Sequence, residues 1–186
     1  GEGVDCVNEF TRVPLTGRVI QVCCGVWFTL VLFEDGRVAG WGSNRDRCLS
    51  SESTIASSFA PINLPFDNIS RLAAGHRHVV ALKQDHSVIS WGDDRYHQLV
   101  QHSGPIADVF AGWHHSILLQ TDHKSLQLFG KNDHNQLAHS DPSTIGNEVH
   151  FEGHIDSVAV GSDHCLVLIS DLGLFSFGWN EHGIVG

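Results

Sequence analysis

The sequence has no methionine, few cations and no long apolar run. Its 11 lysines and arginines face 21 acidic residues, which gives a formal net charge of −10. Such a charge argues against electrostatic binding to nucleic acid or to an anionic membrane. No apolar stretch approaches the roughly 18 residues of a membrane-spanning helix, and no signal-peptide pattern opens the sequence. Because methionine is missing even at position 1, we expect these 186 residues to be a piece of a longer chain.

Cysteines and catalytic signatures are scarce as well. The five cysteines are odd in number and form no C-x-x-C pair, which favours reduced thiols over a disulfide framework. We therefore expect an intracellular location, cytoplasmic, nuclear or both. There is no G-x-S-x-G, no P-loop and no G-x-G-x-x-G after a strand. Since no nucleophile, base and orienting group stand at supporting spacings either, we predict a protein that is not an enzyme and needs no cofactor.

What the sequence does have is one unit that occurs four times. The clearest copy runs from Gly75 to Leu99, GHRHVVALKQDHSVISWGDDRYHQL, and the others start at Gly25, Gly112 and Gly161. In the first, second and fourth copies the glycine of an aromatic-Gly pair follows 17 residues after the starting glycine, and in the third copy it follows 18 residues after it. Such fixed offsets indicate a repeat architecture. An apolar residue stands three positions before each starting glycine, and we expect all four to be buried: Val22, Leu72, Val109 and Val158.

Each copy predicts three short strands and no helix. The second strand is apolar at consecutive positions, as in Val80-Ala81-Leu82, which is typical of a strand covered on both faces. Turns at Asp35-Gly36 and its equivalents join it to the third strand. Long spacers leave room for a fourth strand, such as Ala60 to Leu64, whereas the 20 residues from Gly92 to Gly112 predict a clipped outer strand. Short antiparallel units in series are typical of a β-propeller.

The repeat resembles that of the regulator of chromosome condensation family. The shared pattern is I-x-x-V-x-x-G-x-x-H, an apolar triplet, Asp-Gly, V-x-x-W-G and N-x-x-G-Q-L, and it is clearest at Ile69, Leu72, Gly75 and His78. The resemblance covers roughly residues 19–186 and implies a seven-bladed propeller. We therefore predict an all-β chain whose four units form an incomplete arc of that propeller. The units are expected at about 19–68, 69–105, 106–154 and 155–186, with residues 1–18, including a strand at Phe10 to Leu15, as the end of a preceding blade.

The chain departs from the family pattern at several positions. Phenylalanine replaces the family's histidine at Phe28 and its tryptophan at Phe129 and Phe177. The glycine before Gln-Leu, which Gly183 keeps, is replaced by Arg47, His97 and Asn135. The segment FGWNEHG, residues 177–183, resembles one in two family branches, those of the secretion-regulating guanine nucleotide exchange factor and of the yeast alpha-tubulin suppressor. The latter branch implies a small zinc protein as partner.

Fourteen histidines raise the alternative of a zinc-binding face. His76 and His78 would share one face of a strand and could both reach a zinc ion. However, His78, His115 and His164 recur at one repeat offset, which favours a structural role, with a half-buried imidazole bonded to a neighbouring backbone carbonyl. We therefore predict no metal site.

Recurrent aspartates and paired cysteines also favour structural roles. Asp35 and its equivalents Asp85, Asp122 and Asp171 fall in turns, where an aspartate bonds its own backbone. Cys23 and Cys24 precede Gly25 at the offset of two alanines in the second copy, which predicts buried and inert thiols.

The remaining functional signal comes from the loops. In an antiparallel meander the loops after the first and third strands share one face, and the aspartate turns lie on the other. Tryptophan, tyrosine and arginine most often contribute interface energy. Packing against the neighbouring blade is the alternative for the three loop tryptophans. The predicted partner-binding residues on the shared face, with Arg77 beside them, are Trp27, Arg95, Tyr96, His97, Trp113, His114, Trp179, Asn180, Glu181 and His182.

We therefore predict a non-catalytic protein–protein interaction propeller, a scaffold or regulatory subunit that binds a protein partner through one loop face. The alternative that the resemblance implies is a guanine nucleotide exchange factor for a small GTPase. No long insertion is present to act as the wedge that the family inserts at a nucleotide site. The expected partners are a small GTPase or a small zinc protein, and neither nucleic acid nor membrane is expected.

Overall fold

The computed structural model describes residues 9–50 and 57–186, which form fourteen strands in four antiparallel sheets. We call these sheets blades 1 to 4 in chain order. Blade 1 holds β1 (Val19–Cys24), β2 (Phe28–Phe33), β3 (Val38–Ser43) and β4 (Ser57–Asn63), and blade 2 holds β5 (Ile69–Ala74), β6 (His78–Lys83) and β7 (Val88–Gly92). Blade 3 holds β8 (Ile106–Ala111), β9 (His115–Gln120), β10 (Ser125–Gly130) and β11 (Gly146–His150), and blade 4 holds β12 (Ile155–Val160), β13 (His164–Ile169) and β14 (Gly173–Gly178). A single 3₁₀ turn, η1 (Glu181–Gly183), is the only helix among the described residues.

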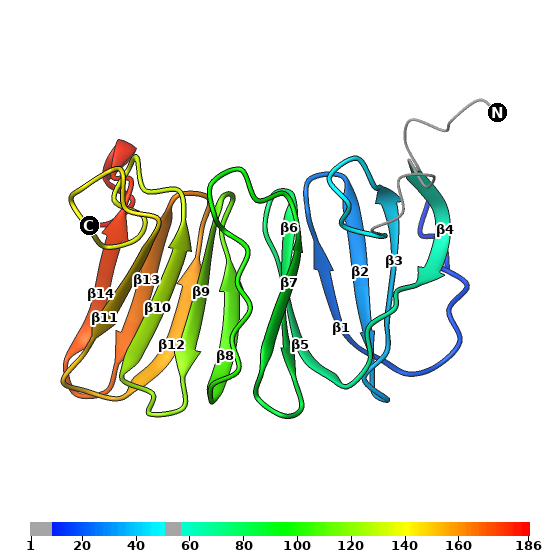
Figure 1. Cartoon of the computed structure of the whole chain (residues 1–186), viewed down its shortest axis with the longest axis horizontal. Helices are drawn as coiled ribbons and strands as arrows, with labels where there is room; N and C mark the ends of the chain where they lie inside the picture. The colour runs from blue at the N-terminus through cyan, green and yellow to red at the C-terminus, as the bar shows by residue number, and fades with distance from the viewer. Residues whose placement is uncertain (1–8, 51–56) are drawn as a thin grey trace.

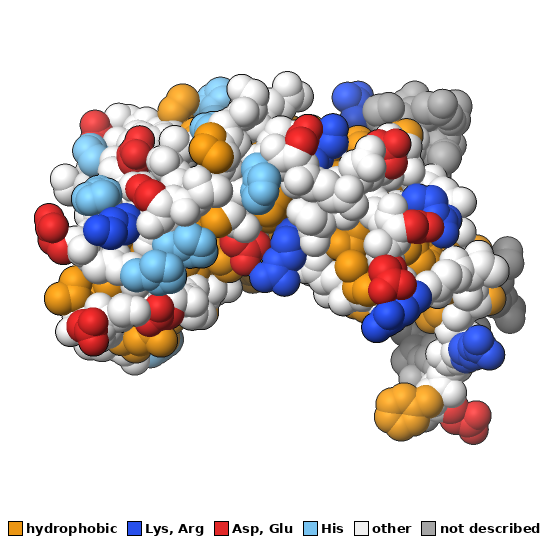
Figure 2. All heavy atoms as spheres, turned by 90° about the horizontal axis from the view of Figure 1, so that it is seen from below, with side chains coloured by type: hydrophobic (Ala, Val, Ile, Leu, Met, Phe, Trp, Pro, Cys, Tyr) orange, Lys and Arg blue, Asp and Glu red, His pale blue; other side chains and the backbone are white. Residues whose placement is uncertain are grey.

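The blades stand side by side in chain order, with blade 1 at the right end of the row and blade 4 at the left end (Figure 1). Seen from below, the row curves around a hollow on one side (Figure 2). The first strands of neighbouring blades, β1, β5, β8 and β12, contact one another in series. The predicted all-β fold is therefore confirmed, and the structure is an open arc of propeller blades with the first strand of each blade innermost.

The number of strands per blade follows the spacer lengths. The predicted fourth strand of blade 1 is present as β4, and the long spacer of blade 3 supplies β11. Blade 2, whose spacer is short, ends at its third strand and has only an isolated bridge between Val88 and His102 beyond it. The clipped outer strand of blade 2 is thus confirmed.

Apolar residues on both faces of each second strand form the cores between blades. Leu30 and Leu32 of β2 pack in one cluster with Val79 and Ala81 of β6. Burying one such side chain stabilises the fold by about 1.5–3 kcal/mol. The other face of β6 packs toward blade 3, and a third cluster joins blades 3 and 4. Each blade is therefore held by its neighbours rather than by a core of its own.

The recurrent G-x-x-H spacing has a steric cause. A Cβ atom on Gly75 would lie 2.2 Å from Cε1 of His78, and one on Gly112 would lie 2.0 Å from Cε1 of His115. In each case the residue three positions on folds back over the glycine. Phe28 takes the same place over Gly25 in blade 1, at 2.1 Å. The histidine and phenylalanine at this offset therefore serve the same packing purpose.

One of the four burial predictions is wrong. Leu72, Val109 and Val158 are 4%, 4% and 8% exposed, whereas Val22 is 60% exposed. This position packs against the preceding blade, and the described residues contain no blade before β1. The flank at the other end of the arc is open for the same reason, with Leu174 64% exposed.

Residues 9–18 form no strand, contrary to the strand expected at Phe10 to Leu15. An outer strand is defined by its ladder to a third strand, and none precedes β1 in the described part of the chain. Leu15 instead packs against Val31 and Phe33 on the outer flank of blade 1. Residues 1–8 lie outside the described ranges, so the assignment of 1–18 to a preceding blade stays a prediction.

Candidate protein-interaction face

The loops after the first and third strands of each blade meet on one side of the arc, which we call the loop face. Ser43 N donates to Trp27 O at 2.7 Å in blade 1, and Trp179 N donates to Asp163 O at 2.8 Å in blade 4. The aspartate turns lie on the opposite side, at the bottom of Figure 1. The predicted grouping of the loops is therefore what the structure has.

A chain of backbone hydrogen bonds links these loops from blade to blade. Val26 N donates to His76 O at 3.0 Å, His76 N donates to Trp113 O at 3.2 Å, and Trp113 N donates to Ser162 O at 2.9 Å. Each bond joins the loop after a first strand to the same loop of the next blade. The loop face is therefore a continuous and ordered rim across all four blades.

The loops after the third strands are fixed by one polar side chain each. Asn44 Oδ1 accepts from Leu49 N at 2.8 Å, and Asn180 Oδ1 accepts from Val185 N at 3.1 Å. Asp94 and Asn132 accept from the amide five residues on in the same way. Asn180, predicted as a contact residue, therefore helps to hold its own loop.

The position of the missing family glycine keeps a left-handed backbone. Its φ is 59° at Arg47, 61° at His97 and 59° at Asn135, close to the 72° of Gly183. Left-handed non-glycine residues are uncommon because the Cβ atom is crowded there, and asparagine and histidine tolerate it better than most. The replacement leaves the loop conformation unchanged and adds a side chain, so that His97 is exposed on the loop face.

An aromatic cluster from blades 2 and 3 occupies the middle of the loop face. The Trp113 ring stacks on His76, with centroids 5.1 Å apart, and His114 meets both His76 at 5.4 Å and Tyr96 at 5.0 Å. Lys131 Nζ lies 5.4 Å from the centre of the Tyr96 ring. Trp113 remains 52% exposed. Sequence reasoning brought Tyr96, Trp113 and His114 to this face correctly and missed Lys131, which has no repeat signal.

The other two loop tryptophans lie apart from this cluster. Trp179 stacks on His134 of blade 3, with centroids 4.8 Å and planes 15° apart, and is 37% exposed. Trp27 has no ring partner among the described residues and is 67% exposed. Glu181 and His182 are exposed, and His182 Nε2 lies 3.8 Å from Glu181 Oε1. The predicted residues therefore form a central group, a pair in blade 4 and an isolated tryptophan in blade 1.

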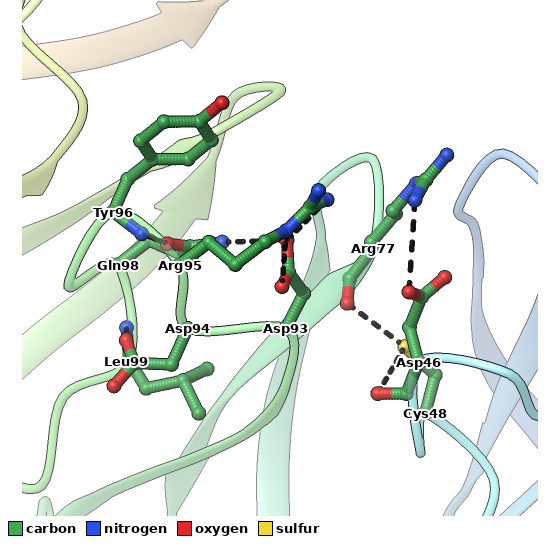
Figure 3. Close-up of polar contacts among 9 residues, drawn as sticks. All are labelled: Asp46, Cys48, Arg77, Asp93, Asp94, Arg95, Tyr96, Gln98 and Leu99. Atoms are coloured by element: carbon green, nitrogen blue, oxygen red, sulfur yellow. Dashed lines mark hydrogen bonds and ion pairs between the residues drawn. The ribbon is translucent and has the colours of Figure 1, made fainter.

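Charges on the loop face are paired (Figure 3). Arg95 donates to both carboxylate oxygens of Asp93 at 2.8–3.0 Å, and Arg77 lies 3.7 Å from Asp46 of blade 1. Burial raises the pKa of Asp93, but the hydrogen bonds and charge of Arg95 outweigh it and hold that pKa below its ordinary value. Arg95 is therefore engaged with its own loop rather than free.

Two of the three recurrent histidines are more deeply buried than predicted, whereas His164 is half-buried as predicted. His78 and His115 are fully inaccessible, and burial lowers the pKa of His78 to about 4 and that of His115 to about 3. His78 Nε2 lies 2.9 Å from Ser116 Oγ, and that hydroxyl donates to Gln98 O at 2.7 Å. The predicted hydrogen bond between the imidazole and a backbone carbonyl is therefore not direct at His78, because the Ser116 hydroxyl lies between the ring and Gln98 O. No hydrogen-bond partner reaches either ring nitrogen of His115 within the described structure.

Three of the turn aspartates bond their own backbone as predicted, whereas the two neighbouring cysteines are less buried than predicted. Asp85 Oδ1 accepts from Ser87 N at 3.0 Å, two residues on, and Asp35 and Asp122 do the same in their turns. Cys23 is half-buried, and burial raises the pKa of its thiol to about 12. Cys24 is exposed, contrary to expectation, because it lines the inner surface of the arc.

No group of three or more histidine, cysteine or acidic side chains among the described residues is arranged to hold a metal ion. In the same ranges no helix is long and apolar enough to cross a membrane.

The repeat signature of the regulator of chromosome condensation family matches residues 19–48 and 69–98. These stretches hold the first three strands of blade 1 and all three strands of blade 2. Blades 1 and 2 therefore carry the regulator of chromosome condensation repeat. The solved structure of yeast Prp20p agrees with the fold, with a TM-score of 0.74 at 25% identity over 86% of this chain and 43% of that one.

Similar curated proteins cover the chain almost fully. The ultraviolet-B receptor UVR8 of Arabidopsis thaliana is 28% identical over 95% of this chain and 46% of its own length. The regulator of chromosome condensation of Mus musculus is 25% identical over 100% of this chain and 37% of its own length. The chain thus spans less than half the length of these relatives, and their activities are not established for it.

Proposed function

We propose that this chain is a non-catalytic propeller segment that binds a protein partner through the loop face. The observation that carries the proposal is the exposure of Trp113 on a rim whose backbone is already fixed by hydrogen bonds between blades. A large, rigid aromatic side chain held in place loses little conformational freedom on binding. Interface energy is concentrated in such anchors.

The paired charges support the same proposal. Because Arg95, Arg77 and Lys131 are each bound to a carboxylate of the loop face, none is held ready for a phosphate or nucleic acid. A protein partner with polar groups at the rim of its interface and an apolar centre is therefore a better match for the loop face than a phosphate or a nucleic acid. The predicted intracellular location is part of the proposal.

A photo-crosslinking amino acid placed at Trp27 or at Trp113 tests the proposal in cell extracts. We expect a discrete protein adduct from both positions and none from Lys124, an exposed residue of the opposite turn face. Equal labelling from Lys124 would contradict the assignment of the loop face as the binding surface.

Once an adduct is identified, Trp113→Ala is expected to weaken binding of that purified partner by about 10- to 1000-fold, because an anchor of this kind contributes about 2–4 kcal/mol. Titration of the partner against the wild type and this variant measures the loss. Lys124→Ala is the matched control and should leave the affinity unchanged.

Nucleotide exchange on a small GTPase is the second candidate function, favoured by the similarity to Prp20p, whose structure was reported with its binding to Gsp1p and histones. Release of labelled GDP from Gsp1p and from a panel of other small GTPases distinguishes the two. We expect no acceleration by this chain. Acceleration that Trp113→Ala abolishes would make exchange the function of the same face.

A further inference from the structure

A pocket of about 380 Å³ lies between blades 1 and 2, beside the loop that follows β3. Sites that hold small molecules typically have volumes of about 300–1,000 Å³. The apolar part of its wall is formed by Leu49, Pro65, Phe66, Trp91 and Leu99. The polar part is formed by Arg47, Ser50 and Ser90, together with Gly92. Arg47 is the one charged residue among the described residues that line the pocket.

The aromatic side of the pocket is held in place by two contacts. The rings of Phe66 and Trp91 stack with centroids 4.2 Å apart and planes at 26°. Trp91 Nε1 donates to Cys48 O at 2.9 Å, which ties the indole to blade 1. A flat apolar surface is therefore already formed and needs no rearrangement to receive a ligand.

The chain that follows Leu99 closes the pocket along β7. Ser90 Oγ accepts from Val100 N at 2.5 Å and donates to Val100 O at 2.7 Å. Farther along, Val88 exchanges backbone hydrogen bonds with His102 at 2.8 and 3.1 Å. The Ser90 hydroxyl is thus engaged within the fold, and the side of the pocket at β7 is bounded by this chain's own residues.

Two departures from the repeat meet in the pocket, and the first concerns Leu99. Its equivalents Leu49 and Leu137 are 1% and 0% exposed within the cores between blades. In blade 2 the neighbouring Val100 takes the core place at 8% exposure, and Leu99 lines the pocket instead, half-buried. The pocket therefore gains an apolar side chain that the other blades keep in their cores.

The second departure is Arg47, which stands where the family pattern has glycine. Its backbone keeps the left-handed conformation, with φ at 59°, and the residue is exposed. Five other arginines of the described chain have carboxylate partners, whereas the Arg47 side chain makes no ion pair or hydrogen bond within the described ranges. Its guanidinium donors are therefore available at an apolar wall.

We propose that this pocket binds a small organic anion with a flat apolar body and one carboxylate. The body lies against Phe66, Trp91 and Leu99, and Arg47 binds the carboxylate. The planar fork of a guanidinium matches the two oxygens of a carboxylate, and a charged hydrogen bond is stronger where an apolar wall excludes water. One unpaired cation calls for one negative charge. None of the residues of this pocket is among those assigned to partner binding, so the proposal does not rest on the proposed function.

A pair of probes that differ in charge tests the site. The probes are 2-naphthylacetate and the neutral 2-naphthylacetamide. In ¹⁵N spectra we expect 2-naphthylacetate to shift the Trp91 indole and the amides of Gly92 and Leu99, with a dissociation constant of about 1 mM, which is usual for a ligand of this size. The neutral amide should bind about five- to tenfold more weakly, because it cannot form a charge-assisted bond with Arg47. Equal binding of the two probes, or shifts confined to other parts of the chain, would overturn the proposal.

Two arginine variants test the source of the selectivity. Arg47→Asn keeps the loop, because Asn135 holds the same left-handed position in blade 3 with φ at 59°. We expect it to weaken 2-naphthylacetate to the level of the neutral amide and to leave the affinity for the amide unchanged, so the amide reports that the pocket is intact. Arg45→Asn alters an exposed arginine of the same loop that does not line the pocket, and should change neither affinity. An equal loss in Arg45→Asn would mean that the acetate responds only to overall charge, and would refute the site.

A peptide tests whether the carboxylate comes instead from the end of a protein chain. The probe is acetylated Gly-Gly-Ser-Phe with a free carboxyl terminus, which offers an aromatic ring and a carboxylate together. We expect it to bind more weakly than 2-naphthylacetate, because its flexible chain loses conformational freedom on binding. Tighter binding of the peptide would identify the carboxyl terminus of a partner protein as the occupant, and would overturn the assignment to a small molecule.

Discussion

Trp91→Ala is expected to lower the free energy of unfolding by about 3–5 kcal/mol, the usual range for losing a large aromatic side chain from a core. The indole packs against the core between blades 1 and 2 and stacks on Phe66. It also bonds Cys48 O of blade 1, so its loss removes both packing and a hydrogen bond between blades. A loss of this size is a large share of the 5–15 kcal/mol that typically stabilises a domain.

Two further variants make the measurement decisive. Trp91→Phe should cost only about 1 kcal/mol, the worth of one hydrogen bond, because Phe129 and Phe177 fill the same repeat position in blades 3 and 4. Trp179→Ala removes a ring that is stacked on His134 but 37% exposed, and it should change stability little. Urea unfolding of the three variants gives the comparison. If Trp179→Ala unfolds as readily as Trp91→Ala, its indole is a structural residue and leaves the candidate binding face.

The fold could be predicted because the same pattern of apolar residues, glycines and turns occurs four times in the sequence. The consecutive apolar residues of the second strands, such as Val80 to Leu82, need a covering sheet on each side, and the spacing of the glycines sets where each strand turns. The 20-residue spacer after Gly92 excludes a fourth strand, as the structure bears out. One sequence pattern therefore specifies both the blades and their order.

The candidate site could be predicted only in part, because its details depend on contacts between blades. Nothing in the sequence places Lys131 beside Tyr96, or His134 against Trp179, since these partners come from loops that vary in length. The exposure of Val22 depends on whether a blade packs against β1, and the sequence of its own repeat does not contain that information. Periodicity locates a residue within its blade, and the neighbouring blade decides what it touches.

Acidification from pH 6.5 to pH 4 is expected to destabilise the chain by at least about 3 kcal/mol. In the unfolded chain a histidine binds a proton near pH 6.5, whereas burial lowers the pKa of His78 to about 4 and that of His115 to about 3. Between these values the unfolded state holds more protons, so stability is full above pH 6.5 and is lost as the pH falls. The 2.5-unit difference for His78 corresponds to about 3 kcal/mol at 1.36 kcal/mol per unit.

Burial also lowers the pKa of His76 and of His114, so both of these histidines add to the loss of stability in this window. The aspartates of the turns and of the loop face, including Asp35, Asp85, Asp93 and Asp133, have pKa values held below the ordinary 3.8 by their hydrogen bonds and cations. A depressed carboxyl pKa contributes stability that is lost only below about pH 3.8. Loss of stability between pH 6.5 and about pH 5 therefore reports on the histidines with a lowered pKa, which are His76, His78, His114 and His115.

The chain itself supplies the variant that tests this origin. Phe28 fills in blade 1 the place that His115 fills in blade 3, and it is only 5% exposed. Because no hydrogen-bond partner reaches either ring nitrogen of His115 in the described structure, His115→Phe gives up no bond there. We expect it to be as stable as the wild type at pH 7.5 and to lose markedly less stability by pH 4.5, as measured by urea unfolding at both pH values. His182→Asn, which alters an exposed imidazole, should follow the wild type. An unchanged pH dependence in His115→Phe would show that the proton uptake on unfolding arises elsewhere.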